Sequence, residues 1–344
     1  MQKKIIGTIP MCYSTSAMPV GDSWKLIYAG EGDGRLVVYD GPAFSHSTVV
    51  WDEQDKLGGT MSICPVEDEQ DSFFASTGFF DMVHSETSAI WLVQEKNGVY
   101  RKKCVCRIPY LHRFDVTRVG NRRFLIACTL HSGKKDPSDW STPGKILVGE
   151  LPLDLSGEVH TELTVLRDDL FQNHGFNRIY DHGVCKFGVA TRDGVFLVTP
   201  PQNEHGKWDV RCVLPMDASD VCAMDLDGDG ELEYGLIRPF HGDRFEVYKS
   251  VNGQPELVYA HPKHQNFTHA IHAGLLNGIP CFAIGARGGD QEIFLLHYAP
   301  ERGYCTRSVE MGAGPSNVCM AMAQSQSILL AANREKDEAA LYCL

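Results

Sequence analysis

The sequence contains no apolar run of about 18 residues, so it has no segment typical of a membrane-spanning helix. None of its 12 cysteines forms a CxxC pair, which argues against a zinc ribbon or a redox dithiol. They lie in apolar, strand-like segments such as KKCVCRIP and PCFAIG, which favours buried free thiols in a reducing cytoplasm. The N-terminus is a poor secretion signal because Gly7, Thr8 and Pro10 interrupt its apolar stretch. We therefore expect a cytoplasmic protein without a membrane partner.

Basic character and several catalytic motifs are also missing. The formal net charge is −12 and no Lys/Arg stripe occurs, so nucleic acid is not an expected partner. The sequence has no GxSxG, P-loop or HExxH motif, and no GxGxxG follows a strand-like segment. These absences leave hydride transfer and phosphoryl transfer without support.

A repeated pattern of strands replaces the missing helical periodicity. Apolar segments of the type GRLVVYD recur along the chain, and each follows another strand-like segment of the type FLIACT. The GRLVVYD-type segments lie at 34–41, 88–98, 144–152, 193–201, 243–253, 291–303 and 338–344. The spacing gives seven units of roughly 45–60 residues, the size of a four-stranded propeller blade.

The pattern predicts an all-β protein whose residues 1–344 form a single seven-bladed β-propeller domain. The last unit stops after its third strand, and KKIIGTIP forms a spare strand near the N-terminus. We expect this strand to join the C-terminal blade and close the ring, which removes an open sheet edge. The alternative, two packed β-sandwiches, gives no reason for seven similar units.

Residues 225–233, DLDGDGELE, have the spacing of a calcium loop. Asp225, Asp227 and Asp229 supply oxygen atoms, Gly230 permits the bend, and Glu233 closes the shell. The loop joins the first two strands of unit five, on the face away from the variable loops. We expect a structural Ca²⁺ here; the alternative is an Asp/Gly-rich turn that holds no ion.

Histidines recur at one place in the repeat. His112, His174 and His269 each stand at the start of a first strand, where these strands converge on the channel of a propeller. A single histidine there is usually structural, but three favour a transition-metal site. Imidazole nitrogens suit Zn, Mn, Fe or Ni.

The loops between second and third strands open on the same face and supply further candidates. Histidines near neutral pKa suit proton transfer, and arginines suit an anionic group of the substrate. The catalytic candidates are His84, His131, Arg192, His241 and Arg287, with His131 or His84 as the acid or base and Arg192 or Arg287 on the anionic group. The substrate-binding candidates are Lys134, Trp140, Arg113 and Arg238. Any one of them is equally well read as a solvated loop residue.

DLDGDGELE resembles the calcium loop of FG-GAP/VCBS-type propeller repeats. Together with the following HAIHAGLLNGIPCFAIGARGG, it is similar to sugar-acting propellers of the aldos-2-ulose dehydratase type and to rhamnose–glucuronate lyases. The resemblance implies metal-assisted β-elimination or isomerisation of a sugar by histidines and arginines of one face. The chain lacks the added β-sandwich domain and a secretion signal, which favours a small intracellular sugar or glycoside over a polymer.

We therefore predict an enzyme, a carbohydrate lyase, dehydratase or isomerase that abstracts a proton from a small sugar, keto-sugar or uronate glycoside with the help of a divalent metal. Two alternatives stay open. One is a non-catalytic propeller that binds proteins or glycans, and the other is a metal-dependent lactone or glycoside hydrolase.

Overall fold

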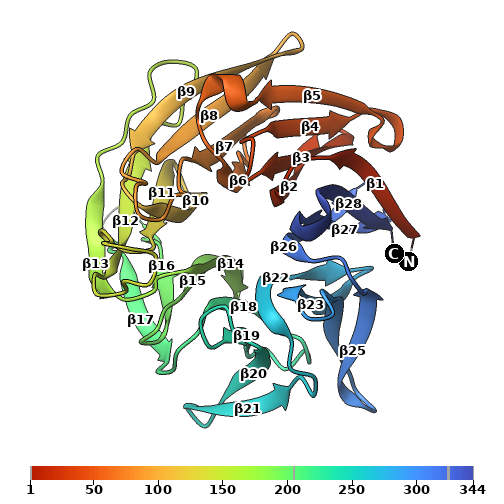
Figure 1. Cartoon of the computed structure of the whole chain (residues 1–344). Coiled ribbons are helices and arrows are strands. Elements are labelled where there is room, and N and C mark those ends of the chain that lie inside the picture. Colours follow the sequence, from red (N-terminus) through yellow and green to blue (C-terminus); the bar gives the residue numbers. More distant parts are fainter. Residues whose placement is uncertain (1, 204–205, 324–325, 344) are drawn as a thin grey trace.

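Seven four-stranded antiparallel sheets surround a central channel in the computed structural model (Figure 1). The structure describes residues 2–203, 206–323 and 326–343. Each sheet is built from consecutive strands, except that the strand nearest the N-terminus completes the sheet nearest the C-terminus. The predicted seven-bladed β-propeller of four-stranded blades is confirmed.

Each blade runs from an inner strand beside the channel to an outer strand at the rim. The inner strands are β2 (Cys12–Val20), β6 (Thr60–Pro65), β10 (Leu111–Val119), β14 (Gly175–Asp181), β18 (Asp220–Met224), β22 (Asn266–Leu276) and β26 (Pro315–Ala323). The second strands are β3 (Ser23–Gly30), β7 (Ser72–Thr77), β11 (Arg122–Thr129), β15 (Val184–Ala190), β19 (Glu233–Arg238), β23 (Ile279–Gly288) and β27 (Gln326–Asn333).

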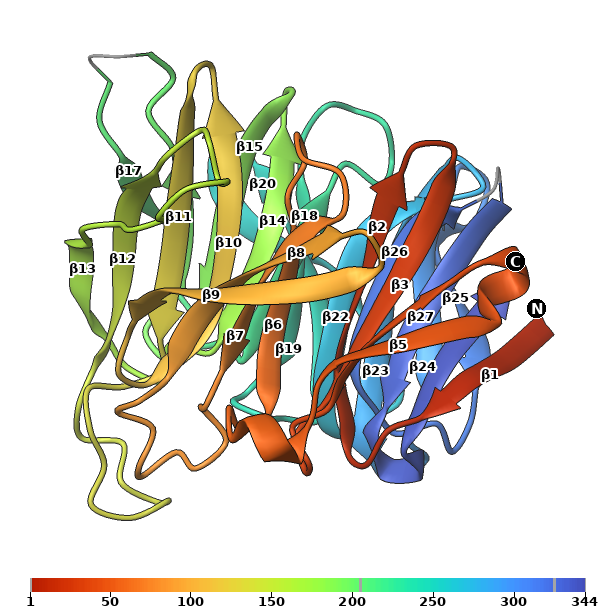
Figure 2. The ribbon, with the colours of Figure 1, turned by 90° about the horizontal axis from the view of Figure 1, so that it is seen from above.

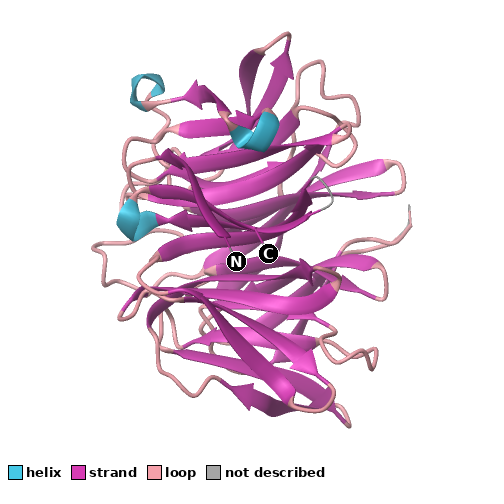
Figure 3. Cartoon of the chain, turned by 90° about the vertical axis from the view of Figure 1, so that its right-hand side faces the viewer, coloured by secondary structure: helices cyan, strands magenta, loops and turns pink. Residues whose placement is uncertain are grey.

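The third strands coincide with the repeated segments of the sequence. They are β4 (Leu36–Asp40), β8 (Ala89–Lys96), β12 (Gly144–Leu151), β16 (Val195–Thr199), β20 (Arg244–Val251), β24 (Ile293–Ala299) and β28 (Glu338–Cys343). The outer strands are β5 (His46–Trp51), β9 (Val99–Arg107), β13 (Thr164–Leu170), β17 (Asp209–Leu214), β21 (Gln254–Ala260), β25 (Gly303–Glu310) and β1 (Gln2–Thr8). Three short 3₁₀ helices complete the described elements: η1 (Pro42–Phe44), η2 (Glu53–Asp55) and η3 (Arg334–Lys336). Figure 3 shows how completely strands dominate the described chain.

The hydrophobic core lies between neighbouring blades. Phe73 and Phe74 of β7 are both fully buried, but they face opposite ways because side chains alternate along a strand. Phe73 packs in a cluster with Trp51 of the preceding blade, and Phe74 packs in one with Phe114 of the following blade. The central strands are therefore covered on both faces, which explains their continuous apolar runs.

The ring closes through β1, which pairs antiparallel with β28 from Gln2 opposite Cys343 to Thr8 opposite Glu338. Lys3 adds ion pairs to Glu310, at 2.8 Å, and to Glu338, at 2.6 Å. The two ends of the chain consequently lie side by side (Figures 1 and 3). The predicted closure by the N-terminal strand is confirmed, while Met1 and Leu344 lie outside the described residues.

The connections between strands sort onto the two faces of the ring. Figure 2 shows the ring from its edge: η2, which leads into β6, lies on the same face as η3, which joins β27 to β28. Turns between first and second strands lie on the opposite face. Among the described residues, no helix is long and apolar enough to cross a membrane.

Candidate functional site

One residue from each blade occupies an equivalent position where the inner strand enters the channel. In β2, β6, β10, β22 and β26 this residue is an extra one at a β-bulge, and in the other two blades it directly precedes β14 or β18. We call these residues the mouth ring: Tyr13, Met61, His112, His174, Ser219, His269 and Ser316. A bulge redirects a side chain out of the regular alternation of a strand. The same local distortion therefore delivers side chains from different blades to one place.

Backbone carbonyls fix the proton of each ring histidine. Nδ1 of His112 lies 2.9 Å from the carbonyl oxygen of His174, and Nδ1 of His174 lies 2.9 Å from that of Ser219. Nδ1 of His269 makes the same contact, at 2.8 Å, with Ser316. A carbonyl only accepts, so each Nδ1 carries the proton and each Nε2 keeps its lone pair. Histidines that bind metals through Nε2 are usually held in this way.

His241 approaches the same place from the loop between β19 and β20. Its backbone is left-handed, with φ of 48°, in a turn closed by the Gly242 N–H donating to the carbonyl of Pro239 at 2.8 Å. Nε2 of His241 lies 3.0 Å from Nε2 of His174. Nitrogens bound to one metal ion at about 2.0–2.1 Å stand roughly 3–3.4 Å apart, so this spacing fits a shared ion.

Three imidazoles thus form the candidate metal centre. The ligand atoms of His174, His241 and His269 all lie within 4.8 Å of one another. His112 stacks at a tilt beside His174, with ring centroids 4.4 Å apart, but it does not belong to this group. Of the three histidines predicted as metal ligands, the geometry therefore unites His174 and His269, and it adds His241, which the sequence suggested for catalysis.

Burial keeps these histidines neutral. It is the largest cause that lowers the pKa of His112, His174 and His269 well below the usual value, and neighbouring histidines and the Arg113 guanidinium act in the same direction. Burial and then Arg287 lower the pKa of His241 to about 4. Metal binding requires neutral imidazole, so the cluster is ready to bind an ion at neutral pH without releasing protons.

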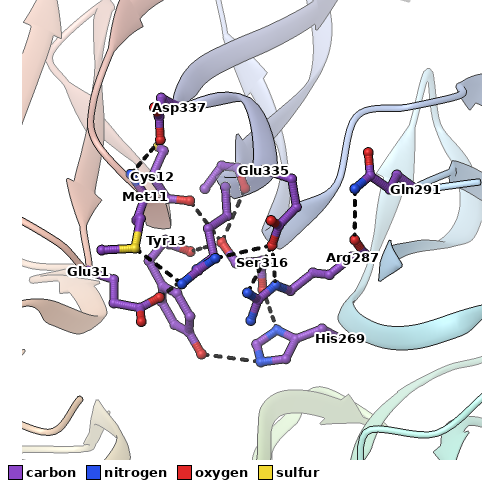
Figure 4. A network of polar contacts seen from close by, with 12 residues as sticks. Met11, Cys12, Tyr13, Glu31, His269, Arg287, Gln291, Ser316, Glu335 and Asp337 are labelled. Carbon is purple, nitrogen blue, oxygen red and sulfur yellow. Dashed lines mark hydrogen bonds and ion pairs between the residues drawn. The ribbon is translucent and has the colours of Figure 1, made fainter. Parts of the chain in front are cut away.

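Tyr13 and a network of charged residues complete one side of the site (Figure 4). The Tyr13 hydroxyl lies 3.2 Å from Nε2 of His269, to which it donates because that nitrogen is unprotonated. Arg287 pairs with Glu335 at 2.9 Å, and Arg334 pairs with Glu31 at 2.5 Å. The network therefore joins the first, sixth and seventh blades around the histidines.

A pocket of about 230 Å³ lies over the cluster. Its lining includes His112, the three histidines of the candidate metal centre and several aromatic rings, among them Phe79, Phe80, Trp140 and Phe240. Glu31 and Arg287 are the charged residues in this lining. Apolar rings with a few polar groups are typical of a site for a small organic ligand.

The other predicted catalytic residues lie outside this lining. His84 is exposed, and Arg192 is exposed with its guanidinium over the Phe171 ring. His131 is buried, but its Nδ1 accepts a hydrogen bond from the Gly133 N–H within its own loop, at 3.1 Å. Among the predicted acids, bases and anion-binding residues, only His241 and Arg287 line the pocket.

Of the predicted substrate-binding residues, only Trp140 lines this pocket. The Lys134 ammonium lies 3.2 Å from the centre of its ring. Arg238 is engaged in ion pairs with Asp217, at 2.6 Å, and Glu246, at 2.9 Å. Arg113 lines a different cavity, on the other side of the mouth ring.

The predicted calcium loop carries an internal cation. The Lys249 ammonium lies 2.8 Å from carboxylate oxygens of Asp227 and Asp229 and 2.7 Å from Glu233, which is directly opposite it in the β19–β20 ladder. Asp225 accepts hydrogen bonds from the Gly228 and Gly230 backbone instead. Asp225, Asp227 and Asp229 are close enough together to hold one ion. A calcium ion would compete with the ammonium for most of these oxygens.

Comparisons with known proteins support the fold. No family model matches the sequence, and no curated protein matches it. A similar solved structure is that of a Bacteroides uniformis protein provisionally described as a 6-phosphogluconolactonase: TM-score 0.54, 14% identity, 96% of this chain and 88% of that chain covered. At this identity the likeness shows a shared propeller fold alone. Membership of the FG-GAP or sugar-lyase families stays a prediction.

Sequence reasoning missed Tyr13 and Glu31 as members of the site. Tyr13 had a usable signal, because it occupies in the first blade the position that His112 occupies in the third. The equivalence shows when the blades are aligned, but the bulge that turns both side chains toward the channel is not visible in the sequence pattern. Glu31 had no signal, since it stands in a glycine-rich hairpin turn.

Proposed function

We propose that this protein is a metal-dependent enzyme that acts on a small carbohydrate, with a divalent transition metal held by His174, His241 and His269. The observation that carries the proposal is the convergence of three neutral imidazoles, two buried and that of His241 half-buried, in the lining of a small pocket. When bound, the ion would polarise a carbonyl or carboxylate oxygen of the substrate and make the neighbouring C–H more acidic.

The favoured reaction is proton abstraction followed by β-elimination or isomerisation. Arg287 lines the pocket and would bind an anionic group of the substrate by exchanging its ion pair with Glu335, as a guanidinium suits a carboxylate. His112 accepts the proton at Nε2, because its Nδ1 is tied to the carbonyl of His174. In elimination, the C–H electrons form a carbon–carbon double bond and the C–O bond on the next carbon breaks. The leaving oxygen then takes up the proton that His112 accepted, so His112 returns to its neutral form.

The pocket itself argues for a small substrate. Its volume of about 230 Å³ is below the range usual for drug-sized ligands. The rings of Phe80, Trp140 and Phe240 offer apolar surfaces to the C–H face of a sugar, while polar atoms lie below at the histidines. This arrangement suits a single sugar unit better than a polymer.

A lactone hydrolase is the second candidate. The Bacteroides uniformis protein of similar fold carries a provisional description as a sugar-phosphate lactonase. The same metal centre would then activate water, and the product would gain water without forming a double bond. The third candidate function is a platform that binds proteins or glycans without catalysis.

Metal analysis of the purified protein followed by substrate assays tests the proposal. We expect about one transition-metal ion per chain, turnover of a keto-sugar or uronate glycoside, and new ultraviolet absorbance from the double bond. Acid release from a lactone without such absorbance would favour the hydrolase. No bound ion after metal reconstitution and no turnover of either substrate class would refute the enzyme.

Variants separate the roles. His174→Ala and His241→Ala should each weaken metal binding about 100-fold or more, since even indirect changes around a metal cost 10–100-fold. His112→Ala should keep the metal and lose turnover. His264→Ala is the matched control, because His264 is exposed and pairs with Asp243 away from the pocket.

A further inference from the structure

A second cavity occupies the central channel beyond the mouth ring. Its volume is about 660 Å³, and it is lined by the inner strands and by the β6–β7 turn, which lies on the face opposite the histidine pocket. Neither the metal centre nor its pocket uses it. The residues at its inner end are those that follow the mouth ring by one position, among them Ser62, Arg113 and Asn317.

Arg113 places a positive charge in this wall. Arg113 is only 9% exposed, and one nitrogen of its guanidinium donates a hydrogen bond to the carbonyl of Met61 at 3.1 Å. Among the described residues, no carboxylate lies within 4.0 Å of the guanidinium, and its other N–H groups have no acceptor. A buried guanidinium normally has a paired anion.

Neighbouring donors are also unused. The Ser62 hydroxyl is buried and has no hydrogen-bond partner in the described chain. The Asn317 side chain has none there either. Because both residues share the register position of Arg113 on their own strands, the three donors lie at one level of the channel.

The nearby carboxylates have partners other than Arg113. Asp115 is engaged by Arg178 through two contacts, at 2.6 and 3.0 Å. Asp220 accepts from the backbone N–H of Val221, at 2.9 Å, and burial raises its pKa to about 7 although Arg113 acts against this. The cavity is also lined by Glu67, Asp68 and Glu69, which pair with Arg178 and Arg123. No carboxylate of the described residues is therefore paired with the Arg113 guanidinium.

We propose that the cavity binds a small oxyanion, a phosphate or a carboxylate, against Arg113 with the Ser62 hydroxyl and the Asn317 amide as further donors. Arginine binds both groups through paired N–H contacts. The site is separate from the metal centre and does not rest on the proposed function. A ligand carrying such a group enters from the opposite face of the ring.

Thermal unfolding of the metal-free protein tests this site. Inorganic phosphate and acetate are titrated separately at constant ionic strength, maintained with chloride. The preferred anion should raise the melting temperature. Once its concentration exceeds the dissociation constant, the increase should follow the logarithm of the concentration, as expected for a ligand that binds only the folded state. The arm with the steeper response identifies phosphate or carboxylate as the ligand group.

Arg113→Gln should abolish the response. Arg167→Gln should keep it, because Arg167 lies on the outer strand β13 and pairs with Asp169. If Arg113→Gln does not fold, Ser62→Ala serves instead and should weaken binding by severalfold. No saturable response to either anion, or an unchanged response in a folded Arg113→Gln or in Ser62→Ala, would overturn the proposal.

Discussion

At the scale of single residues, the channel holds imidazoles that are neutral in the folded chain. Burial lowers the pKa of His131, His241 and His272 to about 4. The unfolded chain, with histidine pKa near 6.5, binds more protons between these values. Each such group therefore favours unfolding as the pH falls from about 6.5 to 4.

Asp220 acts in the opposite direction. Burial raises its pKa to about 7, so between about pH 4 and 7 the folded chain holds a proton that the unfolded chain has lost. Its contribution to stability declines as the pH rises through that window. The several histidines outweigh this single carboxyl.

We predict that the free energy of unfolding rises from pH 4 to 6.5, by up to about 1.4 kcal/mol per pH unit for each responding histidine. Calorimetry between pH 4 and 8 measures this. Asp220→Asn removes the opposing contribution, so its stability relative to the native chain should increase from about pH 4 to 7 and then level off. A flat pH profile would contradict the assignment of buried neutral histidines.

Residue-level prediction from sequence succeeded where the repeat itself carried the information. His174 and His269 were found because they hold the same repeat position. The sequence predicted that His241 lies on the same face as the other histidines but did not predict that it joins them. Its left-handed backbone directs the side chain to His174 and His269, and the sequence pattern does not reveal that backbone conformation. His131 was misleading because a hydrogen bond within its loop holds it away from the pocket.

At the scale of elements, Lys249 defines how the 225–233 loop is stabilised. Burial acts to lower the pKa of its ammonium, but the carboxylates of Asp227, Asp229 and Glu233 raise it above the usual value. The sequence hid this contact, because Lys249 meets Glu233 only through the pairing of β19 with β20. We infer that the ammonium supplies positive charge that calcium would otherwise bring.

Lys249→Met should cost about 3 kcal/mol, the usual effect of removing one partner from a buried ion pair. Calcium should restore part of the loss, since the freed carboxylates resemble its usual ligands. Chelation should leave a His174→Ala chain, whose transition-metal site is disabled, unchanged. Lys102→Met, which breaks an ion pair with Asp55 at the exposed rim, should cost no more than about 1 kcal/mol.

Denaturant unfolding with added CaCl₂ or EDTA distinguishes the alternatives. If EDTA destabilises the His174→Ala chain as strongly as Lys249→Met does, the loop binds calcium and Lys249 is secondary. The strands themselves were the most predictable elements. Second and third strands are buried on both faces, so their apolar runs are conspicuous, whereas inner strands bear polar residues toward the channel.

At the scale of the whole molecule, closure of the ring depends on a strand contributed from the other end of the chain. β1 covers the edge of β28, and Gly7 lies so close to Tyr39 that a Cβ would stand 1.9 Å from its hydroxyl. The closure was predictable because the last repeat lacked one strand and a spare one stood at the start. How much the closure contributes to stability could not be predicted from the sequence.

Deleting residues 1–8 should lower the melting temperature and cause association, because the exposed edge of β28 can pair with another chain. Size-exclusion chromatography and thermal unfolding check this. A synthetic peptide of the same residues should reverse this association by adding back the strand. Lys3→Ala, which removes only the pairs with Glu310 and Glu338, should change little.

The residues of the mouth ring face the channel and do not belong to the regular strand pairing that forms the blades. Each of its members is contributed by a different blade and sits at a bulge or just before a strand, so its side chain has no role in the alternation that buries the blades. Exchanging Met61 or Ser219 for histidine should therefore add a nitrogen donor and leave the sheets intact. The donors at the channel mouth can therefore be changed one blade at a time while the blades themselves keep their packing.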